Sequence, residues 1–179
     1  MDKERIYGIL REGLVYLLLI LLCVFVVPKY VIQRTVVSGA SMEDTLHDGE
    51  SLMVEKVSYH FTDPDRFDVV VFYPDAEDRA EYYVKRVIGL PGETIQITGD
   101  DIYINGELLP EDYGKQEMVY SGIAEEPLVL GDDEYFLMGD NRYVSFDSRY
   151  EAIGPVHKDM IAGKAIVRIW PLNKIGLFK

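Results

Sequence analysis

The chain contains 179 residues, enough for one domain and a short anchor segment. Hydrophobic residues make up 48% of the chain and it contains 13 tyrosines, which excludes a disordered protein. The formal net charge of -13 excludes nucleic acid as a partner, because binding nucleic acid requires a basic face. The chain has one cysteine, and its three histidines lack the spacing of metal ligands, so we expect no disulfide within the chain, no metal and no cofactor.

The N-terminal part of the chain contains one long apolar run. Residues 14–27 carry no charge, and after Pro28 and Lys29 the apolar character continues to Ile32. This interval has the length of a membrane-spanning helix if the Lys29 side chain extends to the far interface. We therefore predict a transmembrane anchor at residues 14–32, between an N-terminal segment at 1–13 and a domain at 33–179. A cleavable signal peptide is the alternative, but the small residues at 38–40 lie too far beyond Val27 for a typical cleavage region.

The charges that flank the anchor indicate its orientation. The N-terminal flank carries three basic residues and the other flank carries two, namely Lys3, Arg5 and Arg11 against Lys29 and Arg34. The more basic flank tends to remain in the cytoplasm, so we expect a single span with residues 1–13 inside the cell and the domain outside. Residues 1–35 hold five Lys/Arg and three Asp/Glu, which leaves 13 basic and 28 acidic residues in an acidic domain.

The sequence beyond the anchor predicts a mainly β fold. Runs of β-branched and aromatic residues alternate with turn signals, and no segment has the pattern of a soluble helix. Asn105-Gly106 is a strong hairpin signal, because both central positions of a type I′ turn need positive φ. We expect an antiparallel sandwich or barrel-like fold, with a hairpin tip at 76–80, a surface loop at 110–133, and strands at 51–59, 68–73, 82–90, 93–98, 101–109, 134–138 and 161–170.

The candidate nucleophile is Ser41, in the turn that follows the anchor. A serine hydroxyl needs a neighbouring base to attack a carbonyl at neutral pH. Three histidines are candidates for this base, and His47 is only six residues away, but each sits beside turn residues.

Lys85 is a second candidate base. It lies within a predicted strand next to Arg86, and alternation along the strand directs these two cations to opposite faces. Both faces carry apolar neighbours, so we expect one of the two cations to be buried. Burial lowers the pKa of an ammonium group, whereas a guanidinium stays protonated, so Lys85 is the better base and Arg86 the better ion-pair partner. An ordinary lysine on an exposed sheet edge is the alternative.

A dense polar cluster follows the predicted strand at 134–138. It contains Asp140, Asn141, Ser145, Asp147 and Arg149. A serine hydroxyl of this kind can orient a neutral amine, and Asp147 and Arg149 can form an ion pair, which would contribute under about 1 kcal/mol if it were exposed. An Asx-rich turn without catalytic function is the alternative.

Three segments in this order resemble the motifs of the bacterial type I signal peptidases. They are Gly39-Ala40-Ser41-Met42, the segment 83–92 that contains Lys85, and Gly139-Asp140-Asn141-Arg142 with Ser145, Asp147, Ser148 and Arg149. The resemblance covers nearly the whole chain. It implies a membrane-anchored serine endopeptidase of mainly β fold that removes signal peptides from exported preproteins, after small residues at -1 and -3. It also implies a place at the outer side of the cytoplasmic membrane, with the lipid bilayer and the secretion translocon nearby.

The resemblance also implies roles for individual residues. Ser41 matches the nucleophile and Lys85 the general base, Ser145 matches the hydroxyl that orients the lysine, and Asp147 with Arg149 matches the supporting ion pair. Gly39 stands where some members of the family have a serine that contributes to the oxyanion hole. Asp44 stands where the family usually has a proline, which leaves the rigidity of that turn open.

Two other functions remain alternatives. A self-cleaving regulator of the SOS-repressor type uses the same pair of side chains on a related β fold. An inactive, membrane-anchored β domain is the second alternative. The anchor and the third motif favour the peptidase over both.

Overall fold

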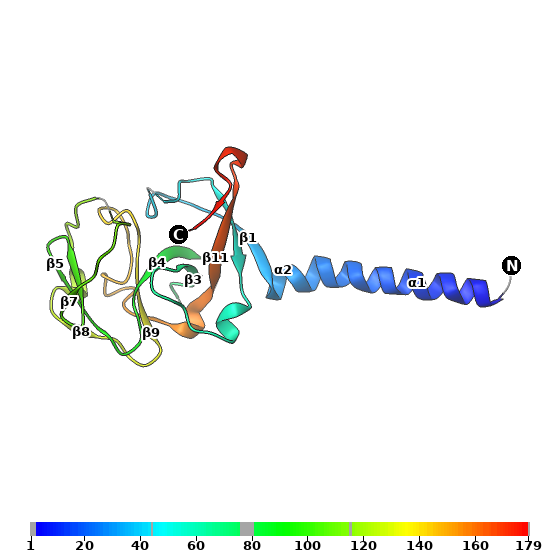
Figure 1. The fold of residues 1–179 in the computed structure, drawn as a ribbon, viewed down its shortest axis with the longest axis horizontal. Helices are drawn as coiled ribbons and strands as arrows, with labels where there is room; N and C mark the ends of the chain where they lie inside the picture. The colour runs from blue at the N-terminus through cyan, green and yellow to red at the C-terminus, as the bar shows by residue number, and fades with distance from the viewer. Residues whose placement is uncertain (1–2, 44, 76–80, 115, 179) are drawn as a thin grey trace.

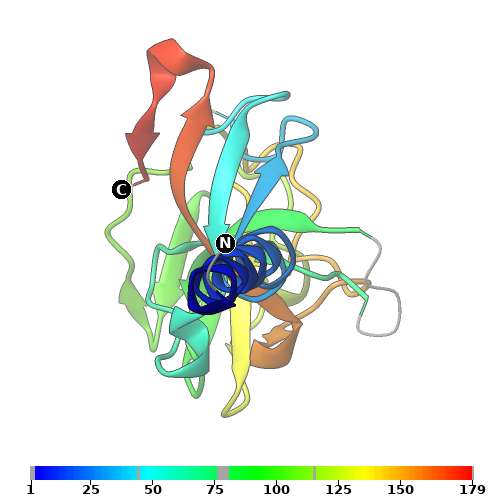
Figure 2. The same cartoon turned by 90° about the vertical axis from the view of Figure 1, so that its right-hand side faces the viewer.

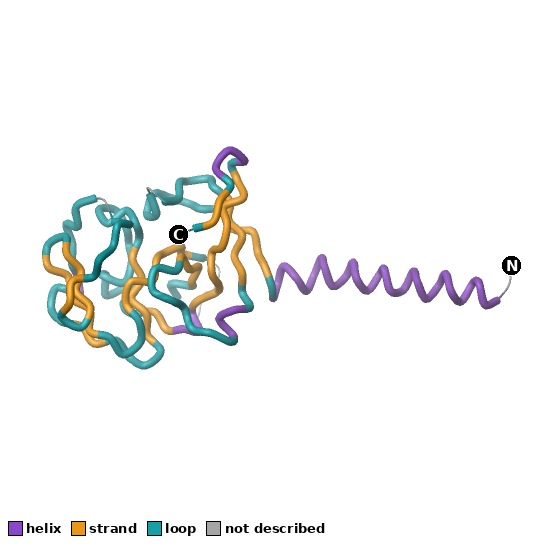
Figure 3. The backbone as a smooth tube through the Cα atoms, in the orientation of Figure 1, coloured by secondary structure: helices purple, strands orange, loops and turns teal. Residues whose placement is uncertain are grey.

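A computed structural model describes residues 3–43, 45–75, 81–114 and 116–178, with side chains from Tyr7 onward. Asp44 and the expected hairpin tip at 76–80 lie outside these residues. One long N-terminal helix projects from a compact β domain (Figure 1). Figure 3 shows that strands and loops make up nearly all of that domain. The predicted class, a mainly β fold preceded by one apolar helix, is confirmed.

The N-terminal helix contains a π-helical turn. It runs through α1 (Lys3–Leu21), the π turn η1 (Leu22–Val26) and α2 (Val27–Tyr30). Pro28 has no N–H to donate to the carbonyl four residues before it, and the turn widens just ahead of this position. Residues Tyr7–Tyr30 are long and apolar enough to cross a membrane, although a signal sequence would meet the same criteria. The helix ends at Tyr30 and Ile32 already belongs to strand β1, so the helix stops before the predicted limit at residue 32.

Eight strands form the larger sheet, in which every pair is antiparallel. Seven of them follow the order β1-β2-β11-β3-β4-β9-β10, and β12 pairs with β11. Their bounds are β1 (Ile32–Val36), β2 (Ser51–Glu55), β3 (Val69–Phe72), β4 (Tyr83–Gly89), β9 (Glu134–Met138), β10 (Val156–His157), β11 (Ile161–Trp170) and β12 (Gly176–Leu177).

The smaller sheet has the order β7-β6-β5-β8, and its core also includes Ile88 of β4 and Phe136 and Met138 of β9. Its strands are β5 (Thr94–Thr98), β6 (Asp101–Ile104), β7 (Glu107–Leu108) and β8 (Leu128–Val129). Asn105 and Gly106 both have positive φ, 53° and 82°, as the predicted hairpin turn requires. Short 3-10 turns complete the domain: η2 (Ser58–His60), η3 (Gly122–Ala124), η4 (Lys158–Met160) and η5 (Leu172–Lys174).

The expected surface loop at 110–133 is corrected by the structure. This segment contains η3 and β8, and its apolar side chains Met118, Ala124 and Leu130 are buried in the core of the smaller sheet. Most of its acidic residues face solvent, which gave the segment the composition of a loop, whereas Glu111 is largely buried against Arg142.

Candidate active site

The turn that carries Ser41 is held on both sides. Gly39 has φ +87°, which favours glycine, and its N–H donates a 2.8 Å hydrogen bond to Asp48 Oδ1. Beyond Ser41, the side chains of Met42 and Leu46 are buried in a core cluster, and Leu46 N–H donates to the Met42 carbonyl. The backbone on both sides of Ser41 is therefore held in place, and Ser41 itself is half-buried.

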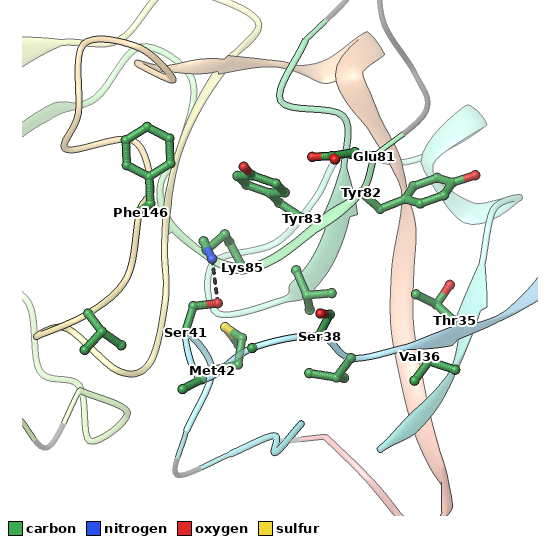
Figure 4. Close-up of a pocket in the computed structure, with 15 residues that line it drawn as sticks. Thr35, Val36, Ser38, Ser41, Met42, Glu81, Tyr82, Tyr83, Lys85 and Phe146 are labelled. Carbon is green, nitrogen blue, oxygen red and sulfur yellow. Dashed lines mark hydrogen bonds between the residues drawn. The ribbon is translucent and has the colours of Figure 1, made fainter. Parts of the chain in front are cut away.

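Lys85 lies against Ser41, and the two come from segments 44 residues apart in the chain. Its Nζ is 2.7 Å from Ser41 Oγ, as the dashed line in Figure 4 shows. Lys85 is 3% exposed, and its pKa is lowered to about 8, mainly by burial; Arg149 contributes to this shift, and the carboxylates of Asp147 and Asp140 oppose it. A substantial fraction of the amine is therefore neutral near physiological pH, and it is positioned to accept the serine proton.

Both cations of β4 are buried, although the sequence predicted burial of only one. Lys85 and Arg86 are 3% and 0% exposed because β4 lies between β3 and β9 with both of its faces covered. Arg86 forms a bidentate pair with Asp140, at 2.8 and 2.7 Å, and its guanidinium lies 3.6 Å from the centroid of the Tyr113 ring. The prediction of Arg86 as a structural ion-pair partner is confirmed.

Ser145 is buried beside the dyad without contacting the amine. It is 1% exposed, and its Oγ has no hydrogen-bond partner among the described residues, so the bond to Lys85 that the resemblance implies is not formed. The amine is directed at Ser41 instead. Ser145 Oγ packs over Gly139, where an added Cβ would lie 2.2 Å from that Oγ and 2.3 Å from the Ser41 carbonyl oxygen. The role of Ser145 in orienting the lysine stays a prediction.

Asp147 and Arg149 form a fully buried ion pair. Arg149 Nε is 2.8 Å from Asp147 Oδ1, and Arg149 Nη2 is 2.9 Å from Oδ2. Arg149 also donates to the carbonyls of Tyr120, Arg142 and Ser145, and Asp147 Oδ2 accepts from Gly139 N–H. The small energy expected for an exposed pair therefore does not apply, because breaking a buried pair leaves a charge without compensation.

Gly139 and Asn141 connect this loop to the nucleophile. Asn141 N–H donates to the Ser41 carbonyl at 3.1 Å, and the Gly139 backbone packs against the same oxygen. Asp140, between them, is held by Arg86. The third motif thus fixes the backbone of Ser41, which sequence reasoning had not assigned to it.

A cavity of about 700 Å³ opens at the dyad. It lies between the segment 35–42 and the segment 81–85, in which β4 begins, with Phe146 on one side (Figure 4), and Val144 also lines it. Sequence reasoning missed four of its apolar lining residues, Tyr83, Val84, Val144 and Phe146. Their closeness in sequence to Lys85 and Ser145 could have indicated that they line the site.

The histidines do not form a triad with Ser41. His47 lies 3.6 Å from Glu50, His157 contacts Asp133, and His60 is exposed. In the part of the chain that the structure describes, Ser41 Oγ hydrogen bonds with Lys85 alone. The same part contains no group of three or more His, Cys, Asp or Glu that could hold a metal ion.

Comparisons with known proteins identify the family. Residues 10–170 match the family described as signal peptidase, peptidase S26. The chain is 37% identical over 173 residues to signal peptidase I of Leptolyngbya laminosa, covering 93% of this chain and 83% of that protein. It is 35% identical over 182 residues to signal peptidase I P of Bacillus subtilis subsp. natto, covering 97% of each. A crystal structure of a signal peptidase I from Enterococcus faecalis V583 is 34% identical and covers 57% of this chain and 97% of its own, with a TM-score of 0.46. The chain therefore belongs to the signal peptidase family of serine endopeptidases, peptidase S26.

Proposed function

We propose that this protein is a membrane-anchored signal peptidase that removes signal peptides from exported preproteins, with Ser41 as nucleophile and Lys85 as general base. The observation that carries the proposal is the 2.7 Å contact between Ser41 Oγ and an amine that is 3% exposed. Burial supplies the lowered pKa of about 8 that a lysine base requires.

The chemistry follows from this pair. Neutral Lys85 takes the proton of Ser41 Oγ, the oxygen attacks the scissile carbonyl, and the protonated amine then donates its proton to the leaving nitrogen. Water, deprotonated by the same amine, releases the acyl group from Ser41.

The Ser41 N–H is our candidate for the oxyanion hole. It donates to no acceptor among the described residues, whereas the Gly39 N–H is already bonded to Asp48. A donor aimed at the developing oxyanion can contribute about 3 kcal/mol to transition-state stabilisation. Gly39 has no hydroxyl to add, so we expect the backbone donor to carry this stabilisation.

The cavity supports a preference for small residues at -1 and -3. Two segments, 35–40 and 81–84, border it; strand β1 ends in the first and β4 begins in the second, and an extended peptide laid between them can pair with their backbone groups as an added strand. Phe146 and Tyr83 narrow the space beside the dyad (Figure 4), and Val144 also lines it, which favours small side chains near the scissile bond.

The N-terminal helix supports the anchor. It ends at Tyr30, and the eleven positions from there to Ser41 span at most about 40 Å when extended. The site therefore lies within reach of a membrane-inserted substrate. We propose residues 1–13 in the cytoplasm, the domain at 33–179 on the outer side of the cytoplasmic membrane, and a working position near the translocon.

Cleavage of a preprotein in detergent micelles tests this proposal. Wild-type protein should release the mature product, while Ser41→Ala and Lys85→Met should not. Lys85→Arg is the matched control, because it keeps the positive charge but provides no base, and it should be inactive. Cleavage by any of these variants would refute the Ser41–Lys85 mechanism, and cutting of the chain itself, with the preprotein untouched, would favour the self-cleaving alternative.

A further inference from the structure

A second cavity lies where the N-terminal helix joins the domain. It has a volume of about 630 Å³ and is lined by the end of α2, the end of β2, the turn η2, and residues in and beside η4. Figure 2, viewed along the helix, shows that η2 lies beside the C-terminal end of the helix, on the face of the domain from which the helix emerges. We call this cavity the junction cleft. It is separate from the cavity at the dyad and shares no lining residue with it.

Basic side chains from three parts of the chain converge on the junction cleft. Lys29 lies in the last turn of the helix, Lys56 follows β2, and Lys158 begins η4, with His60 of η2 beside them. Lys158 is paired with Asp63 at 2.6 Å, whereas no carboxylate among the described residues pairs with Lys29 or Lys56. Two carboxylates, those of Asp133 and Asp159, also line the cleft, and Asp133 is engaged by His157 at 3.1 Å.

Two of the three ammonium groups are held in place, yet retain hydrogens for a ligand. Lys56 Nζ donates to Gln33 Oε1 at 2.5 Å and to the Lys29 carbonyl at 3.4 Å. Lys158 Nζ donates to Asp63 and to the Thr62 carbonyl. An ammonium has three hydrogens, so each keeps one that these contacts do not use.

The third ammonium is the least engaged. Lys29 Nζ lies 5.0 Å from the centroid of the Tyr30 ring, and none of the residues described in the structure accepts a hydrogen bond from it. A lysine that ends an apolar helix and has no protein acceptor is suited to an anion in the surrounding medium.

We propose that the junction cleft binds the phosphodiester headgroup of an anionic phospholipid. The inference rests on the membrane anchoring proposed above. Lys29 and Tyr30 are the last two residues of the candidate span, so the cleft opens at the depth where headgroups lie. Tyrosine favours this depth and a lysine side chain can extend to it, and an anionic headgroup complements Lys29 and Lys56, which no carboxylate among the described residues pairs. The lipid would fix the domain against the membrane surface next to its anchor.

Lipid binding to the full-length chain in detergent micelles tests the proposal. Short-chain phosphatidylglycerol, short-chain phosphatidylcholine and inorganic phosphate are titrated separately, and bound ligand is counted by native mass spectrometry. We expect phosphatidylglycerol to bind in a one-to-one complex. The double variant Lys29→Gln/Lys158→Gln should lose about fivefold in affinity for each lysine. Lys29→Arg/Lys158→Arg should bind as the wild type does, and Arg11→Gln, which removes a charge at the other end of the helix, is the matched control.

The possible results separate clearly. Equal binding of phosphatidylcholine, or an equal loss in Arg11→Gln, would overturn the site. Displacement of phosphatidylglycerol by an equal concentration of inorganic phosphate would show a free-phosphate site and overturn the lipid assignment. Preprotein cleavage measured on the same samples should be unchanged by the double variant, since neither lysine lies at the dyad. Loss of cleavage in the wild type would count against the proposed function and leave the lipid result readable.

Discussion

Replacement of Lys85 with methionine should stabilise the domain while it abolishes cleavage. In the folded chain, burial lowers the pKa of this amine from 10.5 to about 8. At pH 7 the amine is mostly protonated in the folded and unfolded chain alike, and the pKa difference corresponds to a destabilisation of about 3 kcal/mol. Methionine fills a similar volume without a charge. Loss of the hydrogen bond to Ser41 offsets about 1 kcal/mol, so we expect a net gain of about 2 kcal/mol at pH 7.

The sign of this effect sets its pH dependence. Below pH 8 the folded chain carries the buried charge, and the full cost is present. Between pH 8 and 10.5 the folded chain has released the proton while the unfolded chain still holds it, so the stability of the wild type rises with pH. The advantage of Lys85→Met should therefore shrink across this window and vanish near its upper end.

Urea unfolding of the full-length chain in micelles measures this difference. Near-ultraviolet circular dichroism reports mainly the packing of the domain, which holds ten of the 13 tyrosines and the single tryptophan. Lys174→Met replaces an exposed lysine of the η5 turn that pairs with Glu50 at 3.2 Å, so it should be no more stable than the wild type and controls for a general stabilisation by methionine. A variant no more stable than the wild type at pH 7, or a stability gain that does not change with pH, would refute the account of Lys85 as a buried, destabilised amine.

Three further predictions concern catalysis and the loop behind the dyad. The kcat/KM for preprotein cleavage should rise with pH around a midpoint near 8, because about a tenth of the amine is neutral at pH 7 and about nine tenths at pH 9; a flat profile would contradict the lysine base. Asp147→Asn should move that midpoint to lower pH, because the carboxylate raises the pKa of Lys85; an unchanged or higher midpoint in the variant's pH profile would contradict this. It should also lower the free energy of unfolding by about 3–5 kcal/mol, measured by urea denaturation, because Arg149 stays buried without its partner. Gly139→Ala should reduce kcat by roughly 100-fold, because the added Cβ meets the Ser41 carbonyl oxygen; near-normal kcat would show that Ser41 tolerates displacement.

The sequence predicted the strands and turns of the fold more accurately than it predicted which segments are buried. The predicted strand at 161–170 coincides with β11, and the Asn105-Gly106 turn has the expected positive φ. These features follow from local rules, since β-branched runs and turn residues act over a few positions. The segment 110–133 was mistaken for a surface loop because its buried side chains are sparse and lie among acidic residues. Their burial depends on a sheet formed by other parts of the chain.

The candidate site shows the same division. The sequence nominated Ser41, Lys85, Asp147 and Arg149 by residue type and by resemblance to a family. It could not show that Lys85 and Arg86 are both buried, because this depends on distant segments of the chain packing on both faces of β4. Nor could it show that Gly139 and Asn141 hold the Ser41 backbone.

By itself, the sequence determined that this chain has an apolar N-terminal helix, an acidic β domain and a serine with a lysine available as its base. These properties depend on composition, periodicity and residue chemistry, which are local. Tertiary structure alone decided that the lysine amine lies 2.7 Å from the serine oxygen and is 3% exposed. Distance and desolvation arise when segments 44 residues apart pack together, and they turn a strongly basic amine into one that can remove the serine proton.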